Sequence, residues 1–348
     1  MVQIRKGWID LLRIAACIMV VGVHVSALCL GDLDVSSINF KIMNGFDCFS
    51  ILGVPLFVMI SGSLILDESY TVSIRNLYLK KAARYAVLYF VWLLIYNVEN
   101  FIYNGSVWSL EAVKDEIILE SLFGRGIYHL WFLPMICTLY LATPFIKSFA
   151  DDKRLCLLFL SVYAVAAVII PTLLKFEFPY KAIMSSIYGQ FPLAIFTGYA
   201  GYYLMGHVLN RYLPKMTHGW LAVTAAVGIV FFAAEVHVCN IYSVKTGKLS
   251  IILNDTMGVT VFVCCCCIFI LFKHLTISDN NILRRLSGLT FGIYLLHPMV
   301  LEFINRMGID TLFAPAYISV PLVTALVFGI TAAFVFIFER MPIVRWLF

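Results

Sequence analysis

Three ionisable side chains stand inside an otherwise apolar stretch near the N-terminus, IDLLRIAACIMVVGVHVS, which covers residues 9–26. Asp10 precedes Arg13 by three residues, a spacing that lets the two pair across one helical turn. Arg13 and His24 are eleven residues apart, so a helix places them on nearly one face, separated by about three turns and ~16 Å. Because imidazole exchanges a proton near neutral pH, His24 is a candidate general base, with Arg13 and Asp10 as further candidate catalytic residues.

The composition of the chain indicates what surrounds this polar stripe. Of its 348 residues, 62% are hydrophobic and 13% are charged, whereas a soluble domain has ~45–50% apolar and ~25% charged residues. The sequence therefore predicts an all-α, polytopic membrane protein. An ionisable group inside a bilayer costs about 2.5–3.5 kcal/mol, so the stripe is expected to face the interior of a helical bundle. Two alternatives involve no chemistry: Asp10 and Arg13 as an ion pair that reaches the interface, and His24 as a packing histidine.

Ten apolar stretches are long enough to cross ~30 Å of hydrocarbon as helices. With the N-terminus inside, the cytoplasmic segments hold about twice as many Lys and Arg residues as the outer segments, which predicts that both termini are cytoplasmic. No internal repeat or linker interrupts the pattern, so residues 1–348 are expected to form a single domain. The predicted spans are 8–30, 44–66, 82–103, 128–149, 155–174, 187–209, 219–239, 251–273, 289–307 and 317–338.

The charged residues outside the predicted spans indicate which kinds of partner the protein can bind. The net charge of +5 is spread among the loops, which argues against a nucleic-acid partner and leaves the lipid bilayer as the expected environment. The longest outer loop, residues 104–127, is acidic, and its segment SLEAVKDEIILESLF is expected to form a short amphipathic helix with Ser109 as N-cap.

Four stretches in order along the chain carry a resemblance to a known family. They are WIDLLRIAACIMVVGVHVS in the first span, VPLFVMISGSLIL in the second, YHLWFLPMICTLYLATPFI in the fourth and FGIYLLHPMVLEF in the ninth. Together they resemble the acyltransferase-3 family of integral membrane acyltransferases, and they are most similar to its branch of WecH-type surface-polysaccharide O-acetyltransferases. The resemblance covers almost the whole chain.

The resemblance implies an acyl-CoA-dependent O-acetyltransferase in the multi-pass membrane of a bacterial cell. The acyl group, usually acetyl, passes from cytoplasmic acetyl-CoA as co-substrate to a hydroxyl of an extracytoplasmic acceptor, which we expect to be a cell-surface glycan or a lipid-linked sugar. Transfer from a thioester needs a base and donors for the developing oxyanion, so neither a metal nor a tightly bound cofactor is expected. The arginine and histidine of the family's first helix correspond to Arg13 and His24.

The family's basic pair at the start of the third span corresponds to Lys80 or Lys81 together with Arg84. These residues stand at the cytoplasmic end of the span and are expected to bind the phosphates of CoA, to which arginine offers a bidentate fork and lysine a point charge. The sequence has lysine where many members have arginine. The alternative is that these residues are ordinary cytoplasmic flanking charges.

Four further residues are candidates for binding the substrate. Asp47 stands near the outer end of its span, where it could receive the acceptor or orient His24, or be a solvated boundary residue. His129 and Trp131 stand at the outer end of the fourth span, where Trp131 is either a platform for a sugar or an interfacial belt aromatic. His297 is deeply placed, and Pro298 behind it opens a backbone carbonyl to the cavity.

A second function stays open beside the enzyme. A ten-span bundle with buried charges is also typical of a transporter or flippase for a small polar solute such as an amino acid. Related membrane domains fused to amino-acid racemases act in serine supply, which agrees with this alternative. The sequence has no sign of an inverted repeat, which favours the acyltransferase.

Overall fold

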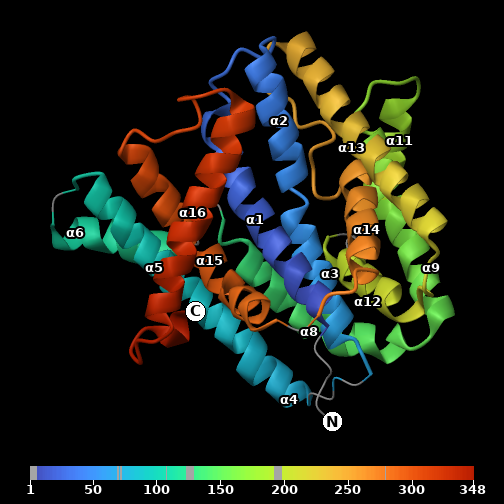
Figure 1. The fold of residues 1–348 in the computed structure, drawn as a ribbon, viewed down its shortest axis with the longest axis horizontal. Coiled ribbons are helices and arrows are strands. Elements are labelled where there is room, and N and C mark those ends of the chain that lie inside the picture. Colours follow the sequence, from blue (N-terminus) through green and yellow to red (C-terminus); the bar gives the residue numbers. More distant parts are fainter. Residues whose placement is uncertain are drawn as a thin grey trace. The chain divides into compact units, whose positions relative to one another are not determined.

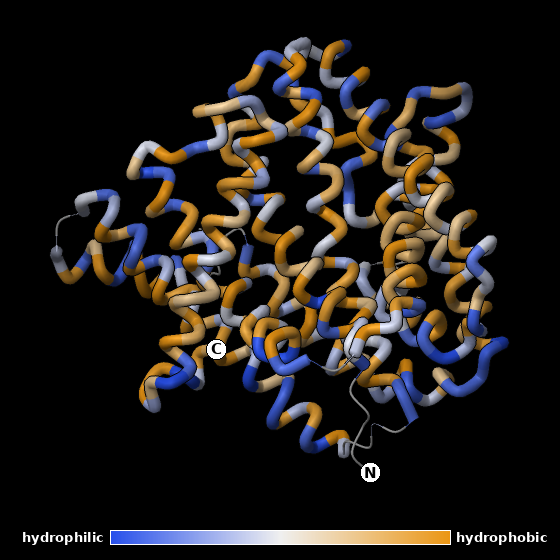
Figure 2. Tube along the Cα trace, in the orientation of Figure 1, coloured by the Kyte–Doolittle hydropathy of each residue, from blue (hydrophilic) through white to orange (hydrophobic). Residues whose placement is uncertain are grey.

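The computed structural model describes residues 6–68, 70, 73–106, 108–122, 129–191, 198–278 and 280–348. Throughout these ranges the regular structure is helical and contains no strand, as the all-α prediction requires (Figure 1). Apolar residues line the long helices and polar residues gather mainly at their ends and in the loops (Figure 2).

The chain divides into two units. The first contains Met1–Ser69 and Phe149–Trp346 with Phe348, and the second contains Tyr70–Ser148 with Leu347. Helices of the first unit are α1 Gly7–Leu30, α2 Ile38–Ser50, α3 Gly53–Ile65, α9 Lys153–Tyr163, η3 Ala164–Ile169, α10 Ile170–Leu173, α11 Lys181–Gln190, α12 Ala200–Tyr212, α13 His218–Thr246, α14 Val259–Lys273, α15 Asn281–Arg306 and α16 Ala316–Phe338. The second unit holds α4 Ile74–Asn76, η1 Leu77–Ala82, α5 Ala83–Tyr103, α6 Leu110–Ala112, η2 Val113–Leu119, α7 Glu120–Leu122 and most of α8 Phe132–Ala150, and a 3-10 turn, η5 Arg345–Leu347, ends the chain.

Eight helices among the described residues are long and apolar enough to cross a membrane, and each matches one of the ten predicted spans. Two of these spans contain more than one helical element. The span Ile38–Ile65 consists of α2 and α3, which are joined at Ile51 and Leu52. The span Ile74–Tyr103 consists of α4 and α5 with the π-helical turn η1 between them. The chain is thus a polytopic membrane protein.

The two other predicted spans differ from the structure. In place of a helix over 187–209, α11 ends at Gln190 and α12 begins at Ala200, while residues 192–197 lie outside the described ranges. In place of a helix over 251–273, α14 begins only at Val259 and has 15 residues. The preceding segment forms turns. In one of them the N–H of Gly258 donates a hydrogen bond of 2.7 Å to the carbonyl oxygen of Asp255, three residues earlier, whereas an α-helix joins residues four apart.

Helix α1 is the centre of the first unit. It packs against α2, α3, α14, α15 and α16, so protein surrounds it on several sides (Figure 1). Apolar side chains with no exposure, including Leu12, Cys17 and Val21, fill these contacts. A polar residue on this helix is therefore held within protein rather than against lipid.

Helices α3 and α12 approach each other through glycines. A Cβ atom added to Gly62 would overlap the backbone of Tyr203, and one added to Gly206 would overlap the backbone of Met59. Small residues of this kind let two helix backbones come into direct contact in a membrane, where van der Waals packing drives association.

The outer amphipathic segment also agrees with the sequence prediction. Helix α6 begins after Ser109, whose hydroxyl accepts a hydrogen bond of 3.1 Å from the backbone N–H of Ala112. Helix continues through η2 to Leu122.

The glycine contact generates a prediction about stability. Gly206→Ala places a methyl group into the backbone of Met59, and we expect a destabilisation of about 1–3 kcal/mol, the usual cost of overpacking. Thermal unfolding of the detergent-purified protein measures it as a fall in Tm. Gly329→Ala in α16, where an added Cβ meets nothing within 4 Å, is the matched control and should keep or raise Tm. Equal Tm values for the two variants would contradict the close approach.

Candidate functional site

Two histidines meet where α1 packs against α15. The ring centroids of His24 and His297 are 5.2 Å apart and their planes lie 29° from parallel. His297 has no exposed surface, whereas His24 is half-buried. His24 therefore faces the interior of the bundle, as the cost of an imidazole in lipid predicts.

The backbone of α15 fixes the orientation of His297. Its Nδ1 lies 2.8 Å from the carbonyl oxygen of Tyr294 and 3.0 Å from that of Ile293. Pro298 has no N–H, so the carbonyl of Tyr294, four residues earlier, lacks its helical donor. The Nδ1–H of His297 takes that place, which assigns the neutral ring the tautomer with its lone pair on Nε2. The freed carbonyl thus binds His297 rather than opening to a cavity, which corrects the expectation for Pro298.

Asp10 and Arg13 lie in the first two turns of the same helix. Asp10 is buried, with 4% of its surface exposed, and Arg13 is half-buried. The helical rise separates Arg13 from His24 by ~16 Å, so the two side chains act at different depths. The pairing of Asp10 with Arg13 stays a prediction.

Asp47 has a different set of neighbours from the histidine pair. Its carboxylate accepts a hydrogen bond of 2.8 Å from the hydroxyl of Ser26 and one of 2.7 Å from the amide of Asn254. Ser26 follows His24 by two residues, about 200° around the helix, so Asp47 and His297 approach α1 from different sides. The roles of Asp47 in orienting His24 and in binding substrate stay predictions.

The basic residues predicted to bind CoA lie in the second unit, at the start of the helix that continues as α5. Lys80 and Arg84 are exposed and Lys81 is half-buried. Lys80 and Lys81 belong to the π-helical turn η1, a rare conformation that is frequent at functional sites.

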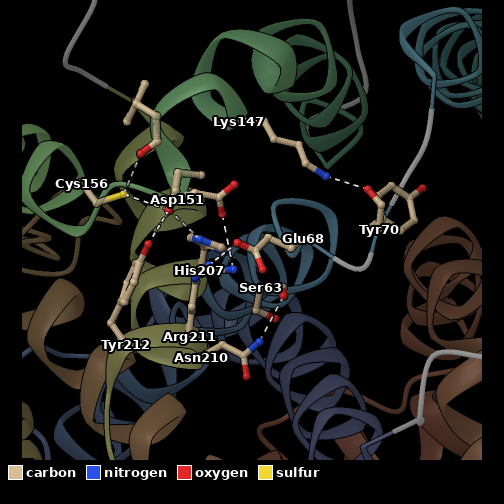
Figure 3. Close-up of polar contacts among 12 residues, drawn as sticks. Ser63, Glu68, Tyr70, Lys147, Asp151, Cys156, His207, Asn210, Arg211 and Tyr212 are labelled. Atoms are coloured by element: carbon tan, nitrogen blue, oxygen red, sulfur yellow. Dashed lines mark hydrogen bonds and ion pairs between the residues drawn. The ribbon is translucent and has the colours of Figure 1, made fainter. Parts of the chain in front are cut away.

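Tyr70 joins two lysines of this unit. The ammonium of Lys81 lies 4.7 Å from the centroid of its ring, and Lys147, near the end of α8, donates a hydrogen bond of 2.6 Å to its backbone oxygen (Figure 3). Lys147 was not among the residues singled out from the sequence, although its position in the last turn of an apolar helix was an available signal.

His129 and Trp131 also belong to the second unit. His129 is buried, and its ring meets that of Tyr96 edge to face at a centroid distance of 4.7 Å. Trp131 is 43% exposed, as both an interfacial aromatic and a sugar platform require. These residues belong to the second unit, whereas the histidine pair belongs to the first.

A polar network at the C-terminal ends of α3 and α12 was not predicted. Arg211 pairs with Glu68 and lies 3.4 Å from Asp151, and the hydrogen bond and charge of Arg211 hold the pKa of the Glu68 carboxyl below its ordinary value (Figure 3). Beside it, the buried His207 donates from Nε2 to the carbonyl oxygen of Ala150 at 3.0 Å. With its charge matched by two carboxylates, Arg211 serves to hold these helix ends together.

Comparisons with known proteins identify the family of the chain. The family described as "Acyltransferase domain" matches residues 6–340, which is nearly the whole chain. An amino-acid racemase of Enterococcus faecalis is 30% identical over 131 residues, and the match covers 36% of this chain. The chain thus spans a small part, 16%, of the length of that curated relative. No solved structure matches it.

The contact between Pro298 and His297 is testable by spectroscopy. Pro298→Ala restores an N–H that competes for the carbonyl of Tyr294, so we expect the population of the Nδ1–H tautomer of His297 to fall. Nitrogen chemical shifts of protein labelled only in histidine report this population. Pro321→Ala in α16 is the control and should leave the His297 signals unchanged. An unchanged tautomer in Pro298→Ala would contradict the assignment.

Proposed function

This chain belongs to the acyltransferase-3 family of membrane acyltransferases, and from that premise we propose that it moves an acyl group, acetyl by default, from cytoplasmic acyl-CoA to a hydroxyl of an extracytoplasmic acceptor. The stacked pair of His24 and His297 is the observation that carries the proposal. It supplies a proton acceptor inside the bundle, where lipid alone would exclude one.

In the proposed reaction His24 acts as general base. The half-buried imidazole takes the proton of the acceptor hydroxyl as its oxygen attacks the thioester carbonyl. A carbon–oxygen bond forms, the carbon–sulfur bond breaks, and the departing CoA sulfur receives the proton from the imidazolium. His297, whose Nδ1–H is bound to the backbone, supports the His24 ring by stacking on it.

The donor is proposed to bind through the basic residues of the second unit. Lys80, Lys81 and Arg84 stand on or next to the widened turn η1, and two of them are exposed. Arginine and lysine together suit the phosphates of CoA, since guanidinium binds a phosphate in bidentate fashion and ammonium as a point charge. Arg13 on α1 stays a candidate catalytic residue.

The acceptor is proposed to be a cell-surface glycan or a lipid-linked sugar, in the bacterial cell membrane, as in the surface-polysaccharide branch that the sequence resembles. The exposed indole of Trp131 supports this proposal, because a flat aromatic face suits a sugar ring. The similarity to an amino-acid racemase does not favour transport of an amino acid, because the racemase is named for the conversion of its substrate and not for moving it.

Replacing the proposed base tests the reaction. We expect His24→Asn to lower acetyl transfer by at least about 100-fold, the lower end of what a positioned base contributes. Membranes that contain the protein are given radiolabelled acetyl-CoA, and label in extracytoplasmic glycan is counted. His237→Asn, an exposed histidine of α13, is the control and should keep full activity. Full labelling by His24→Asn would remove His24 from the mechanism.

The proposed donor site makes a separate kinetic prediction. Loss of one charge-assisted hydrogen bond to a phosphate costs about 1.5–3 kcal/mol, so Lys81→Gln and Arg84→Gln should each raise the KM for acetyl-CoA by about tenfold or more with little change in kcat. Lys114→Gln, an exposed lysine of η2, is the charge-matched control. An unchanged KM in both variants would mean that these residues only flank the membrane.

A further inference from the structure

A second buried polar cluster lies in the first unit, on the opposite side of α1 from His297. It consists of Asp47 on α2, Glu235 on α13 and Asn254 in the turns before α14. All three side chains are buried, with 7%, 0% and 4% of their surfaces exposed, respectively. Glu235 lies within electrostatic range of Asp47 and beside Thr260, so two buried carboxylates lie near each other.

The hydrogen-bond donors in this space do not satisfy its oxygens. Asp47 accepts from Ser26 and from the amide of Asn254. Neither carboxylate oxygen of Glu235, nor the amide oxygen of Asn254, has a hydrogen-bond partner among the described residues. The hydroxyl of Thr260 donates instead to the carbonyl oxygen of Leu253, at 3.3 Å. Three buried acceptor atoms therefore have no hydrogen-bond donor among the described residues.

Burial makes this deficit large. A carboxylate removed from water needs a paired positive charge or several hydrogen bonds to be stable. The nearby ammonium of Lys175 is committed to Asp255, at 2.5 Å. Glu235 is therefore stable in this position only if a cation or a proton neutralises it.

We propose that Asp47, Glu235 and Asn254 form a binding site for one monovalent metal cation, with Na⁺ as the ion that fits. The two carboxylates and the amide of Asn254 offer oxygen atoms, the ligands that hard cations prefer, whereas the nearby thiols of Cys48 and Cys239 suit softer metals. Ca²⁺ takes 6–8 oxygen ligands and Mg²⁺ usually keeps several waters, whereas these three residues offer five side-chain oxygens, two of which already accept hydrogen bonds. These numbers favour a monovalent ion.

The surrounding contacts hold the ligands in place. The amide of Asn44, one turn before Asp47, donates a hydrogen bond of 2.8 Å to Asn240 of α13, so α2 and α13 are fixed to each other next to the site. A cation between Asp47 and Glu235 would connect the same two helices and the turns before α14. This inference does not rest on the proposed acyl transfer, since the site and the histidine pair lie on different sides of α1.

Cation binding is tested on the purified full chain without any substrate. Tm is measured in NaCl, LiCl, KCl, CaCl₂ and choline chloride at equal ionic strength. Because a ligand that binds only the folded state raises stability by mass action, we expect Na⁺ to raise Tm saturably above its value in choline, by about 3 °C or more.

Variants assign the effect to the site. Glu235→Gln keeps the shape of the side chain and removes its charge, and it should lose the Na⁺-dependent shift. Glu177→Gln removes an exposed carboxylate of the same unit and should keep the shift. If Glu235→Gln does not fold, the cation series on the unaltered chain and on Asp47→Asn decides the question. The same Tm in sodium and in choline, a shift only with Ca²⁺, or a full shift in Glu235→Gln would each overturn the proposal. A Tm that responds to pH but to no cation would also overturn it, because protons would then neutralise the carboxylates.

Discussion

Burial of the polar residues of α1 is the constraint on which the rest of the first unit depends. An acid, a base and an imidazole on one membrane helix are stable only where protein or water replaces lipid around them. The structure meets this requirement by surrounding α1 with α2, α3, α14, α15 and α16. The two polar clusters of this unit, one around His297 and one around Asp47, lie on different sides of the same helix, so α1 supplies a side chain to each.

Close helix packing makes that enclosure dense. Backbone contact between α3 and α12 depends on Gly62 and Gly206, which leave no room for a side chain between the helices. At the C-terminal ends of these helices, Arg211 pairs with Glu68 and Asp151. The helices next to α1 are thus fixed by packing at their centres and by charge at their ends.

Hydropathy predicted most of the fold, because a helix that crosses a membrane must be apolar over its whole length. It did not predict the late start of α14 or the interval between α11 and α12, since an average over twenty residues hides a few turn-forming residues such as Asp255 and Gly258. For the site, the cost of charge in lipid was enough to predict that His24 faces the interior. The partners of each polar residue were not predictable, because His24 with His297, and Asp47 with Asn254, meet only after segments far apart in sequence have packed. The sequence indicated that Pro298 frees a backbone carbonyl. It did not indicate that the Nδ1–H of His297 binds this carbonyl, because that contact depends on side-chain torsions that sequence alone does not specify.

The π-helical turn Leu77–Ala82 has a consequence for how this region tolerates change in length. Such a turn contains one residue more than the α-helical turn it replaces. Removing one residue from it would restore regular α-helix and leave the faces of the flanking α4 and α5 where they are, whereas a deletion further along α5 would rotate every later side chain by about 100°. The lysine-bearing turn is therefore the one place in this long helix where the chain can lose a residue without turning its buried face toward the lipid.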